Sequence, residues 1–261
     1  MVPARVTIRE VRAPGDPALA DAHRLLRRIF PRSEMLPRRD WIEVMRERQA
    51  RVWTDLRWHL LVAEVNHKVV GAATGSYLGN VNVGIVGYVA VARAARSRGI
   101  GPRLRRRLLT RFERDAQLIA RKPLTAILGE VRKDNPWLST LIRREDVLAL
   151  DFPYYQPSLE ARRAPVPLVL YYQSLGGAPR RWLSSRELTR LLYTMWRRTY
   201  RIANPLQRPA FQKMLKNLAG RRLVGERPLP GPRRRAAGGA GHPPSAGRHH
   251  KASRTLAPSE P

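Results

Sequence analysis

The amino-acid sequence predicts an α+β fold: a mixed, mainly antiparallel central sheet flanked by helices, followed by a small helical C-terminal extension and a disordered tail. Two observations predict the sheet domain. Three consecutive segments rich in β-formers occupy residues 58–92, as in an antiparallel meander, and segments of helical period lie before and after them. The third observation is a change of composition near Gly176, after which apolar residues recur at helical spacing and then almost disappear beyond Gly225.

The elements around the meander follow from their hydrophobic periodicity. Before it, a strand is expected over Arg5–Val11 and helices over Pro17–Phe30 and about Arg39–Ala50. Within it, Asn66-His67-Lys68 predicts a hairpin turn. After it, a long amphipathic helix is expected up to Pro123, and then a strand (124–131), a short helix (134–145) and two closing strands (147–155 and 165–175).

The expected domain organisation has three parts. Residues 1–175 would form the main domain, and residues 176–225 a helical extension that begins with the linker-like GGAPRR. Residues 226–261 consist mainly of Pro, Gly, Ala, Arg and Ser. Such a segment buries too little apolar surface to offset its ordering entropy, so we expect a disordered tail.

The charge of the chain is strongly basic. Its 261 residues carry 50 Lys and Arg against 20 Asp and Glu, a formal net charge of +30. Such an excess favours polyanionic partners, namely nucleic acid, anionic membrane surfaces or phosphate-bearing ligands. A biased codon composition would produce the same excess of arginine without selection for binding, and the composition alone leaves both interpretations open.

The sequence contains no cysteine, which excludes disulfides, iron–sulfur clusters, thiolate zinc sites and a cysteine nucleophile. No cluster of metal ligands and no Ser/His/Asp arrangement stands out, so we expect no metal. The N-terminal MVPARVTIRE has no apolar signal core, and no uncharged apolar run approaches the ~18 residues that a membrane span needs. We therefore expect a cytoplasmic protein without membrane contact.

The segment ARSRGIGPRLRRRLL (95–109) places two glycines between an expected strand and an expected helix. At Gly99 and Gly101 the backbone can adopt a positive φ, and no side chain blocks a ligand. Backbone N–H groups from Arg98 to Arg103 would point outward, where the helix dipole adds partial positive charge. The site suits a pyrophosphate, although the segment lacks both the Walker pattern and the third glycine of the dinucleotide fingerprint.

The longer segment VAVARAARSRGIGPRLRRRLL resembles motif A of the GNAT superfamily of N-acetyltransferases. That motif is a strand with an apolar-x-Val ending, then [Q/R]-x-x-G-x-[G/A], then an amphipathic helix. Arg96, Gly99 and Gly101 fill its three defined positions, and Val91 ends its strand. The expected order of elements over about residues 5–175 is also that of the family. The alternative is a glycine turn that only packs the helix on the sheet.

The resemblance implies that residues 1–175 bind acetyl-CoA as co-substrate and transfer its acetyl group to a primary amine by direct attack in a ternary complex. It also implies that the loop N–H groups hold the pyrophosphate, and that the pantetheine arm pairs with the strand before the loop, which splays away from the next strand. The cofactor-binding residues implied in this way are Val89, Val91, Arg96, Arg98, Gly99, Ile100, Gly101, Pro102, Arg103 and Asn135.

One part of the family pattern is missing. Asn135 stands where the family's short helix opens with an asparagine that contacts the cofactor arm. The tyrosine that usually donates a proton to the thiolate falls at Ile142, and the Gly-Phe pair that usually follows falls at Asp146-Val147. Isoleucine cannot donate a proton, so the usual thiolate acid is not expected here.

Three residues are candidates for the catalytic proton transfers. Glu130 lies near the expected splay, where desolvation would raise its pKa, unless it faces solvent and pairs with an arginine. Tyr88 lies just before the cofactor-binding part of its strand, and core packing is the alternative. Tyr155, with Tyr154 beside it, lies at the expected substrate lip and could replace the missing donor or order a water; aromatic packing is the alternative.

The sequence does not identify the acceptor. A basic protein argues mildly against polyamines and permits an acceptor with negative charge. The competing hypothesis is a non-catalytic module on a GNAT-like fold that binds CoA, or nothing, and contacts nucleic acid through its basic helix and tail, with steep salt dependence. Non-specific nucleic-acid contact and an oligomer are both compatible with an enzyme too. The helical extension could pack on the main domain, cover the acceptor cleft or form a dimer contact.

Overall fold

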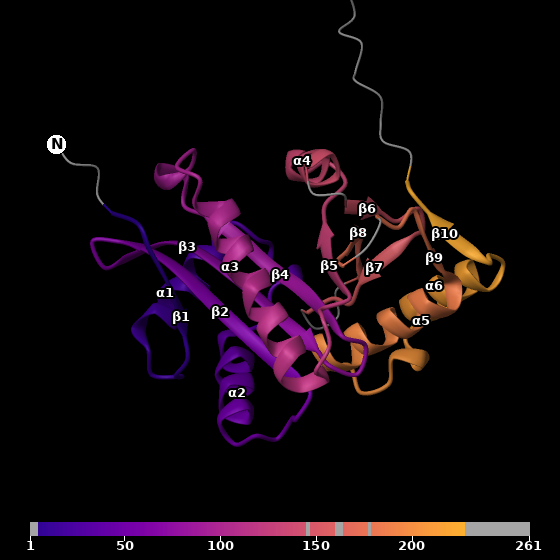
Figure 1. Cartoon of the computed structure of the whole chain (residues 1–261), viewed down its shortest axis with the longest axis horizontal. Helices are drawn as coiled ribbons and strands as arrows, with labels where there is room; N and C mark the ends of the chain where they lie inside the picture. Colours follow the sequence, from indigo (N-terminus) through magenta and orange to yellow (C-terminus); the bar gives the residue numbers. More distant parts are fainter. Residues whose placement is uncertain (1–4, 145–146, 160–163, 177–178, 228–261) are drawn as a thin grey trace, which may run out of the picture. The chain divides into compact units, whose positions relative to one another are not determined.

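The computed structural model describes residues 5–144, 147–159, 164–176 and 179–227. Within these residues the centre is an eight-stranded sheet of order β1-β2-β3-β4-β5-β8-β6, with β7 paired to β8 (Figure 1). β4 and β5 run parallel, and the other neighbours are antiparallel. The predicted α+β class is therefore confirmed. The strands are β1 (Thr7–Val11), β2 (Leu56–Val65), β3 (Lys68–Leu78), β4 (Val83–Val91), β5 (Ala126–Val131), β6 (Val147–Ala149), β7 (Tyr154–Gln156) and β8 (Val166–Ser174).

Helices cover both faces of the sheet because alternate residues of a strand point to opposite sides. On β2, Leu60 and Val62 pack with α1 (Pro17–Arg27) and α2 (Arg38–Gln49), whereas Leu61 and Ala63 pack with α3 (Ile100–Asp115). Figure 1 shows α3 lying across β2, β3 and β4. The short helix α4 (Pro136–Arg144) joins the core on the α3 side.

The segment after residue 176 packs against the C-terminal half of the sheet. It forms β9 (Trp182–Ser184), α5 (Ser185–Thr194), a π-helical turn at Met195–Thr199, α6 (Pro209–Ala219) and β10 (Leu223–Gly225). Its buried Leu188, Trp196 and Phe211 belong to one core cluster with Leu128 and Leu170 of the sheet. The described residues between 5 and 227 belong to one compact unit. The domain boundaries expected at residues 175 and 225 stay predictions. The expected disordered tail lies outside the described residues from residue 228 on.

Several observed elements differ from the expected ones. The strand expected over 147–155 is split into β6 and β7, because the chain leaves the sheet at Asp151, whose N–H donates to Gly225, and Pro153 has no N–H to contribute to a ladder. The long helix expected up to Pro123 ends as a π-helical turn at Ala116–Ala120. The expected hairpin turn is present, since Asn66 and His67 both have a positive φ.

A buried ion network ties β1 to the helices on both faces of the sheet. His59 is 2% exposed, and its ring nitrogens lie 2.8 Å from Glu10 Oε1 and 2.6 Å from Asp115 Oδ2. Arg48 and Arg111 also contact the Glu10 carboxylate. Burial by itself would lower the pKa of His59, but the hydrogen bonds with Asp115 and Glu10 outweigh it and raise this pKa above its ordinary value.

Because both ring nitrogens face carboxylates, we expect His59→Leu to lower the free energy of unfolding by about 3 kcal/mol. This is the lower end of the range for a broken buried ion pair, because Arg48 and Arg111 still neutralise Glu10. Urea unfolding at pH 6 measures this, with the exposed turn residue His67→Asn as the matched control.

The pH dependence of this stabilisation has a definite sign. A histidine whose pKa is raised on folding stabilises the protein fully below the ordinary value of ~6.5, and this contribution is lost as pH rises through the folded-state value. The difference between parent and His59→Leu should therefore narrow in alkaline buffer. Equal stability of the two proteins at pH 6 would contradict the role given to His59.

Candidate active site

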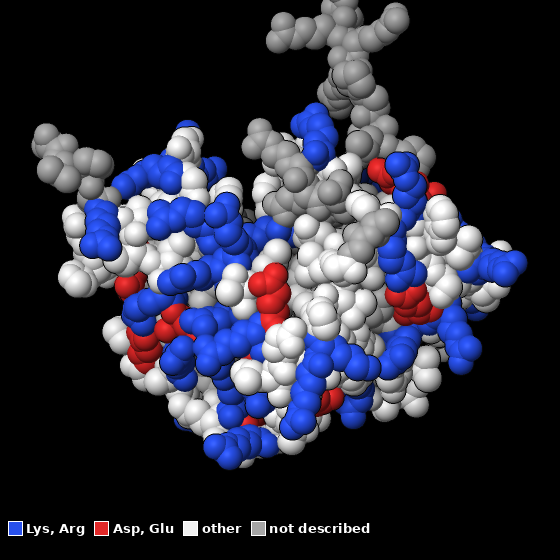
Figure 2. Space-filling view, in the orientation of Figure 1, with Lys and Arg blue, Asp and Glu red and all other residues white. Residues whose placement is uncertain are grey.

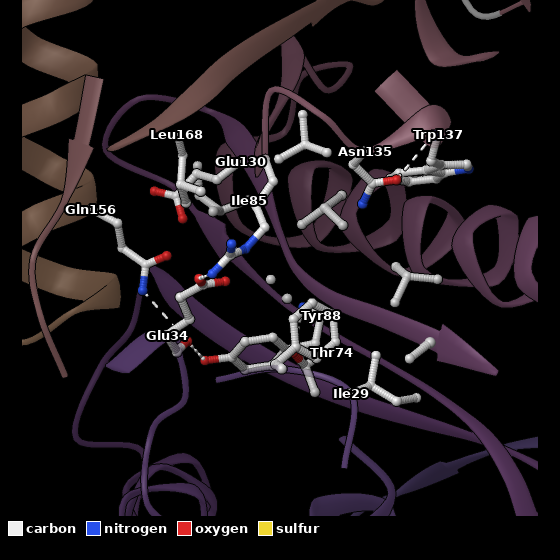
Figure 3. Close-up of a pocket in the computed structure, with 18 of the residues that line it drawn as sticks. Ile29, Glu34, Thr74, Ile85, Tyr88, Glu130, Asn135, Trp137, Gln156 and Leu168 are labelled. Carbon is white, nitrogen blue, oxygen red and sulfur yellow. Dashed lines mark hydrogen bonds and ion pairs between the residues drawn. The ribbon is translucent and has the colours of Figure 1, made fainter. Parts of the chain in front are cut away.

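A cavity of about 480 Å³ opens where β4 and β5 part (Figure 3). The two strands pair only from Val83 opposite Ala126 to Val86 opposite Gly129. At the same level the β3–β4 register shifts, and the Tyr88 N–H donates to Thr74 Oγ1 at 3.1 Å. Residues 87–91 of β4 and 130–131 of β5 therefore line the cavity, with the splay that the resemblance implied.

One end of the cavity lies at the N-terminus of α3. Gly99 precedes the helix with φ 67° and ψ 14°, a left-handed conformation that glycine adopts without steric cost. A Cβ at Gly101 would lie 3.8 Å from Val91, so this position is open. The first N–H groups of a helix have no partner within it, and here they include that of Gly101. Pro102 has no N–H, so the first turn of α3 offers one backbone donor fewer than a helix without proline would.

The implied cofactor-binding residues divide into two groups. Val89, Val91, Arg96, Gly101, Pro102 and Asn135 line the cavity. Arg98, Gly99, Ile100 and Arg103 do not: Ile100 is buried in the core under α3, and the others are exposed on the loop and on the first turn of the helix. The cofactor-binding role of all ten remains a prediction.

Two of these side chains have partners that fix their orientation. The Arg96 Nε–H donates to the carbonyl oxygen of Val91 at 3.3 Å, so this side chain turns back toward the end of β4. Asn135 Oδ1 accepts from the N–H of Trp137 at 3.0 Å, as an N-cap does, and both residues stand at one side of the cavity in Figure 3.

Glu130 lies at the other end of the cavity. Its carboxylate accepts hydrogen bonds from the hydroxyls of Tyr154 and Tyr200, one on each oxygen. Within the described residues it has no arginine partner, which was the alternative that the sequence left open. Burial raises the pKa of Glu130 to about 7, against the opposing effect of the two tyrosine hydrogen bonds and with a contribution from the nearby Glu34.

Tyr88 lines the cavity, but its hydroxyl is engaged with the backbone. It donates to the carbonyl oxygen of Glu34 at 2.7 Å and accepts from the N–H of Leu36 at 3.2 Å. Burial raises the pKa of Tyr88 above its ordinary value, so the hydroxyl keeps its proton at neutral pH. These two hydrogen bonds attach Tyr88 to the loop between α1 and α2. A catalytic role for Tyr88 stays a prediction.

Tyr155 is the candidate that the structure does not bring to this cavity. Adjacent residues of β7 point to opposite sides, so Tyr154 reaches Glu130 while the ring of Tyr155 lies 5.1 Å from Lys213 Nζ on α6. We therefore place Tyr154, and not Tyr155, beside the carboxylate. The sequence offered both tyrosines, and only the strand register decides between them.

Sequence reasoning missed Glu34 and Tyr200. Glu34 is 6% exposed, lines the cavity and pairs with Arg132. Tyr200 comes from the C-terminal segment, 70 residues from its partner Glu130. The aromatic residues of that segment were the signal available for Tyr200. For Glu34, in the loop segment PRSEML, we find no signal in the sequence.

In the part of the chain that the structure describes, no group of three or more His, Cys, Asp and Glu residues could hold a metal ion, and no helix has the length and apolar character needed to cross a membrane.

Comparisons with known proteins agree with this geometry. Residues 19–126 match the family model described as Acetyltransferase (GNAT) family. No curated protein matches the chain at a significant level. Among solved structures, the chain is similar to a putative GNAT-family acetyltransferase from Bacteroides thetaiotaomicron, with 17% identity and a TM-score of 0.52 over 75% of this chain and 99% of that one.

Two further similar structures have lower TM-scores. A putative acetyltransferase from Salmonella typhimurium, solved with its cofactor acetyl-CoA, is 18% identical with a TM-score of 0.46 over 68% of this chain and 99% of that one. A ribosomal-protein-alanine N-acetyltransferase from Brucella melitensis is 20% identical with a TM-score of 0.45 over 65% of this chain and 99% of that one.

The matched residues 19–126 contain the whole of the segment that resembles motif A, and the likeness to the Bacteroides structure shows the same fold. Glu130, Tyr154 and Tyr200 lie beyond the matched residues. The family supports acyl transfer from acetyl-CoA as the general activity. The fold, the splayed strands and this match together identify a GNAT-type acetyltransferase domain that includes residues 19–126.

Proposed function

We propose that this protein transfers the acetyl group of acetyl-CoA to a primary amine by direct attack, with both substrates bound in the cavity between β4 and β5. The observation that carries the proposal is Glu130. It is a carboxylate with a pKa near 7, it is held by two tyrosine hydroxyls, and it lines the same cavity as Gly101 at the start of α3.

The donor end of the cavity fits acetyl-CoA, which supplies an activated thioester when bound. Beyond Val86, β4 has no β5 partner, so its free edge at Val89 and Val91 faces the cavity and could pair with an extended ligand arm, although the Val91 carbonyl oxygen already accepts from Arg96. The left-handed Gly99, the open Gly101 and the positive end of the α3 dipole suit a pyrophosphate. We assign acetyl-CoA binding to the expected catalytic domain, residues 1–175. The side chains of Arg96, Arg98, Arg103 and Asn135 would contribute to it beside this loop.

Glu130 would act as the general base. An amine reaches the site mainly as an ammonium ion and must lose a proton before it can attack a carbonyl carbon. A carboxylate with a pKa near 7 is about half ionised at neutral pH, and a base is most effective when its pKa lies near the operating pH. The hydroxyls of Tyr154 and Tyr200 fix its orientation and stabilise its charged form.

The acceptor end combines negative charge with polar groups. Glu34 and Glu130 face one cavity, and among the described residues Glu34 has an arginine partner and Glu130 has none, so an ammonium group is attracted toward Glu130. The Thr199 hydroxyl also lines the cavity, is buried, and has no hydrogen-bond partner in the described part of the chain. A buried hydroxyl of this kind is available to a substrate group. A thiolate is a good leaving group, which is consistent with an isoleucine at position 142.

The cytoplasmic location stays a prediction, and an oligomer stays compatible with the proposed enzyme. The competing hypothesis of a non-catalytic module also remains, and it predicts a protein that binds CoA without turnover. The three predictions below separate these alternatives.

Acetyl-CoA binding should depend on the open position at Gly101. In Gly101→Glu a carboxylate would stand against the helix N-terminus and repel the pyrophosphate, so we expect the Kd for acetyl-CoA to rise by at least about tenfold, or ~1.4 kcal/mol. Calorimetric titration measures this. The matched control is Gly220→Glu, which adds the same charge at an exposed glycine after α6. An unchanged Kd in Gly101→Glu would remove the donor site from this loop.

Glu130→Gln should lower kcat by roughly 10²–10⁴ while leaving the Kd for acetyl-CoA unchanged, because it removes the base and no donor contact. In the parent protein, kcat/KM should fall as pH drops through about 7, where the carboxylate of Glu130 becomes protonated and can no longer accept a proton. Glu43→Gln, an exposed glutamate of α2, is the control. Turnover that survives Glu130→Gln excludes this base, and a parent that binds acetyl-CoA but acetylates no amine supports the non-catalytic module.

Tyr200→Phe should move the pKa of Glu130 upward, because it removes a hydrogen bond to the ionised carboxylate. A hydrogen bond to a charged group contributes about 1.5–3 kcal/mol, so kcat/KM at pH 7 should fall on the order of tenfold and recover in alkaline buffer. Carbon-13 NMR of the Glu130 carboxyl reads the pKa directly, without turnover. Tyr155→Phe is the matched control, and an equal effect in both variants would rule out the specific contact.

A further inference from the structure

The exposed face of α3 carries arginines that no described carboxylate neutralises. Arg103, Arg106, Arg107 and Arg114 are all exposed, and none of them takes part in an ion pair within the described residues. Figure 2 shows Lys and Arg side chains gathered on this face of the molecule, over α3. Glu113 is the exposed acidic residue of the helix, so the face is strongly positive.

Many arginines elsewhere are paired: those at positions 9, 48, 132, 180, 198 and 201 each contact a carboxylate on a neighbouring element or in the same loop. Others, such as Arg181, Arg186 and Arg222, are exposed and have no ion pair among the described residues. On α3, however, four such arginines follow one another along one exposed helix face, which is a distribution expected of a binding surface.

The arginine row borders a groove between α3 and β1. One hollow, of about 330 Å³, is lined by Ile8, Arg103, Arg106, Arg107 and Thr110. A second, of about 370 Å³, shares Ile8 and Arg107 and continues along Arg9, Arg12 and Arg111, which are paired with carboxylates, Glu10 of this hollow among them. We call the first hollow, together with the exposed row Arg103, Arg106, Arg107 and Arg114, the arginine groove. None of its lining residues lines the acyl-transfer cavity.

We propose that the arginine groove binds the phosphodiester backbone of a nucleic acid. With a helix rise of 1.5 Å per residue, Arg103 to Arg114 span ~16 Å, which matches a row of phosphates and exceeds a single phosphate group. Guanidinium groups form paired hydrogen bonds to phosphate oxygens, and no lysine lines the groove.

The helix is unsuited to a membrane surface. A helix that lies in a membrane interface exposes an apolar face to the lipid. In α3 that face consists of Leu104, Leu108 and Phe112, and all three are fully buried against the sheet. The groove therefore offers charge without an apolar surface for insertion, and a nucleic acid strand is the polyanion that it fits.

The test uses the full chain and measures fluorescence anisotropy of labelled single-stranded RNA and duplex DNA oligonucleotides at several salt concentrations. The groove variant is Arg106→Gln/Arg107→Gln/Arg114→Gln, which leaves the donor-site residue Arg103 intact. The control, Arg181→Gln/Arg186→Gln/Arg222→Gln, removes the same charge from exposed positions near α5 and β10.

We expect the parent to bind with a steep salt dependence and the groove variant to reduce the slope of log K against log [salt] by about 2–3, since each lost phosphate contact contributes about 0.7–0.9. The control should change the slope by less than one contact. Acetyl-CoA affinity and the urea unfolding midpoint should match the parent in both variants.

Several results would overturn the proposal. One is an absence of oligonucleotide binding, and another is an equal loss in the groove variant and the control, which would indicate non-specific attraction by the whole basic chain. A third is displacement of the oligonucleotide by polyglutamate or anionic vesicles at equal charge concentration. A fourth is a groove variant that loses acetyl-CoA affinity and keeps nucleic acid affinity, which would assign these arginines to the donor nucleotide.

Discussion

The site depends on the loss of pairing between β4 and β5 after Val86 and Gly129. A parallel ladder that continued would satisfy the backbone of both strands and fill the space between them. Because the β3–β4 register shifts at the same level, β4 changes which side chains face which layer, and Tyr88 reaches the loop between α1 and α2. Two irregularities at one level of the sheet therefore open the cavity, leave one edge of β4 unpaired and place Tyr88 in the cavity wall.

Glu130 shows the cost of such a site. Burial raises its pKa to about 7, so between the ordinary glutamate pKa and that value the folded state binds more protons than the unfolded state, and this residue makes the fold less stable as pH rises. Two tyrosine hydroxyls reduce this cost without a cation. An arginine in their place would hold the carboxylate ionised at a low pKa and make it a poor proton acceptor. With two uncharged hydroxyl partners, the pKa of Glu130 stays close to neutral pH.

Local sequence was sufficient where the chemistry is local. The turn around Gly99 and Gly101 is specified by a few consecutive residues. For Glu130, the apolar neighbours on β5 indicated desolvation but also allowed a solvent-facing carboxylate paired with an arginine, and only the contacts with Tyr154 and Tyr200 distinguish the two. Tyr155 could not be distinguished from Tyr154 because a strand's side-chain direction depends on its register with β8, which no short pattern encodes. The aromatic residues of the C-terminal segment were a signal for Tyr200, but its contact with Glu130 spans 70 residues, and no local pattern identifies such a partner.

The helical turn before Tyr200 also carries a consequence for how the protein is made. The Tyr200 N–H bonds to the carbonyl oxygen of Met195, five residues earlier, and this wide turn delivers Tyr200 to a carboxylate on β5. During synthesis, the donor loop and the splayed strands emerge well before this residue does. In the nascent chain the glycine loop and Tyr154 are therefore present while Glu130 still lacks its second hydroxyl partner, and its carboxylate reaches its final arrangement only when the C-terminal segment has folded.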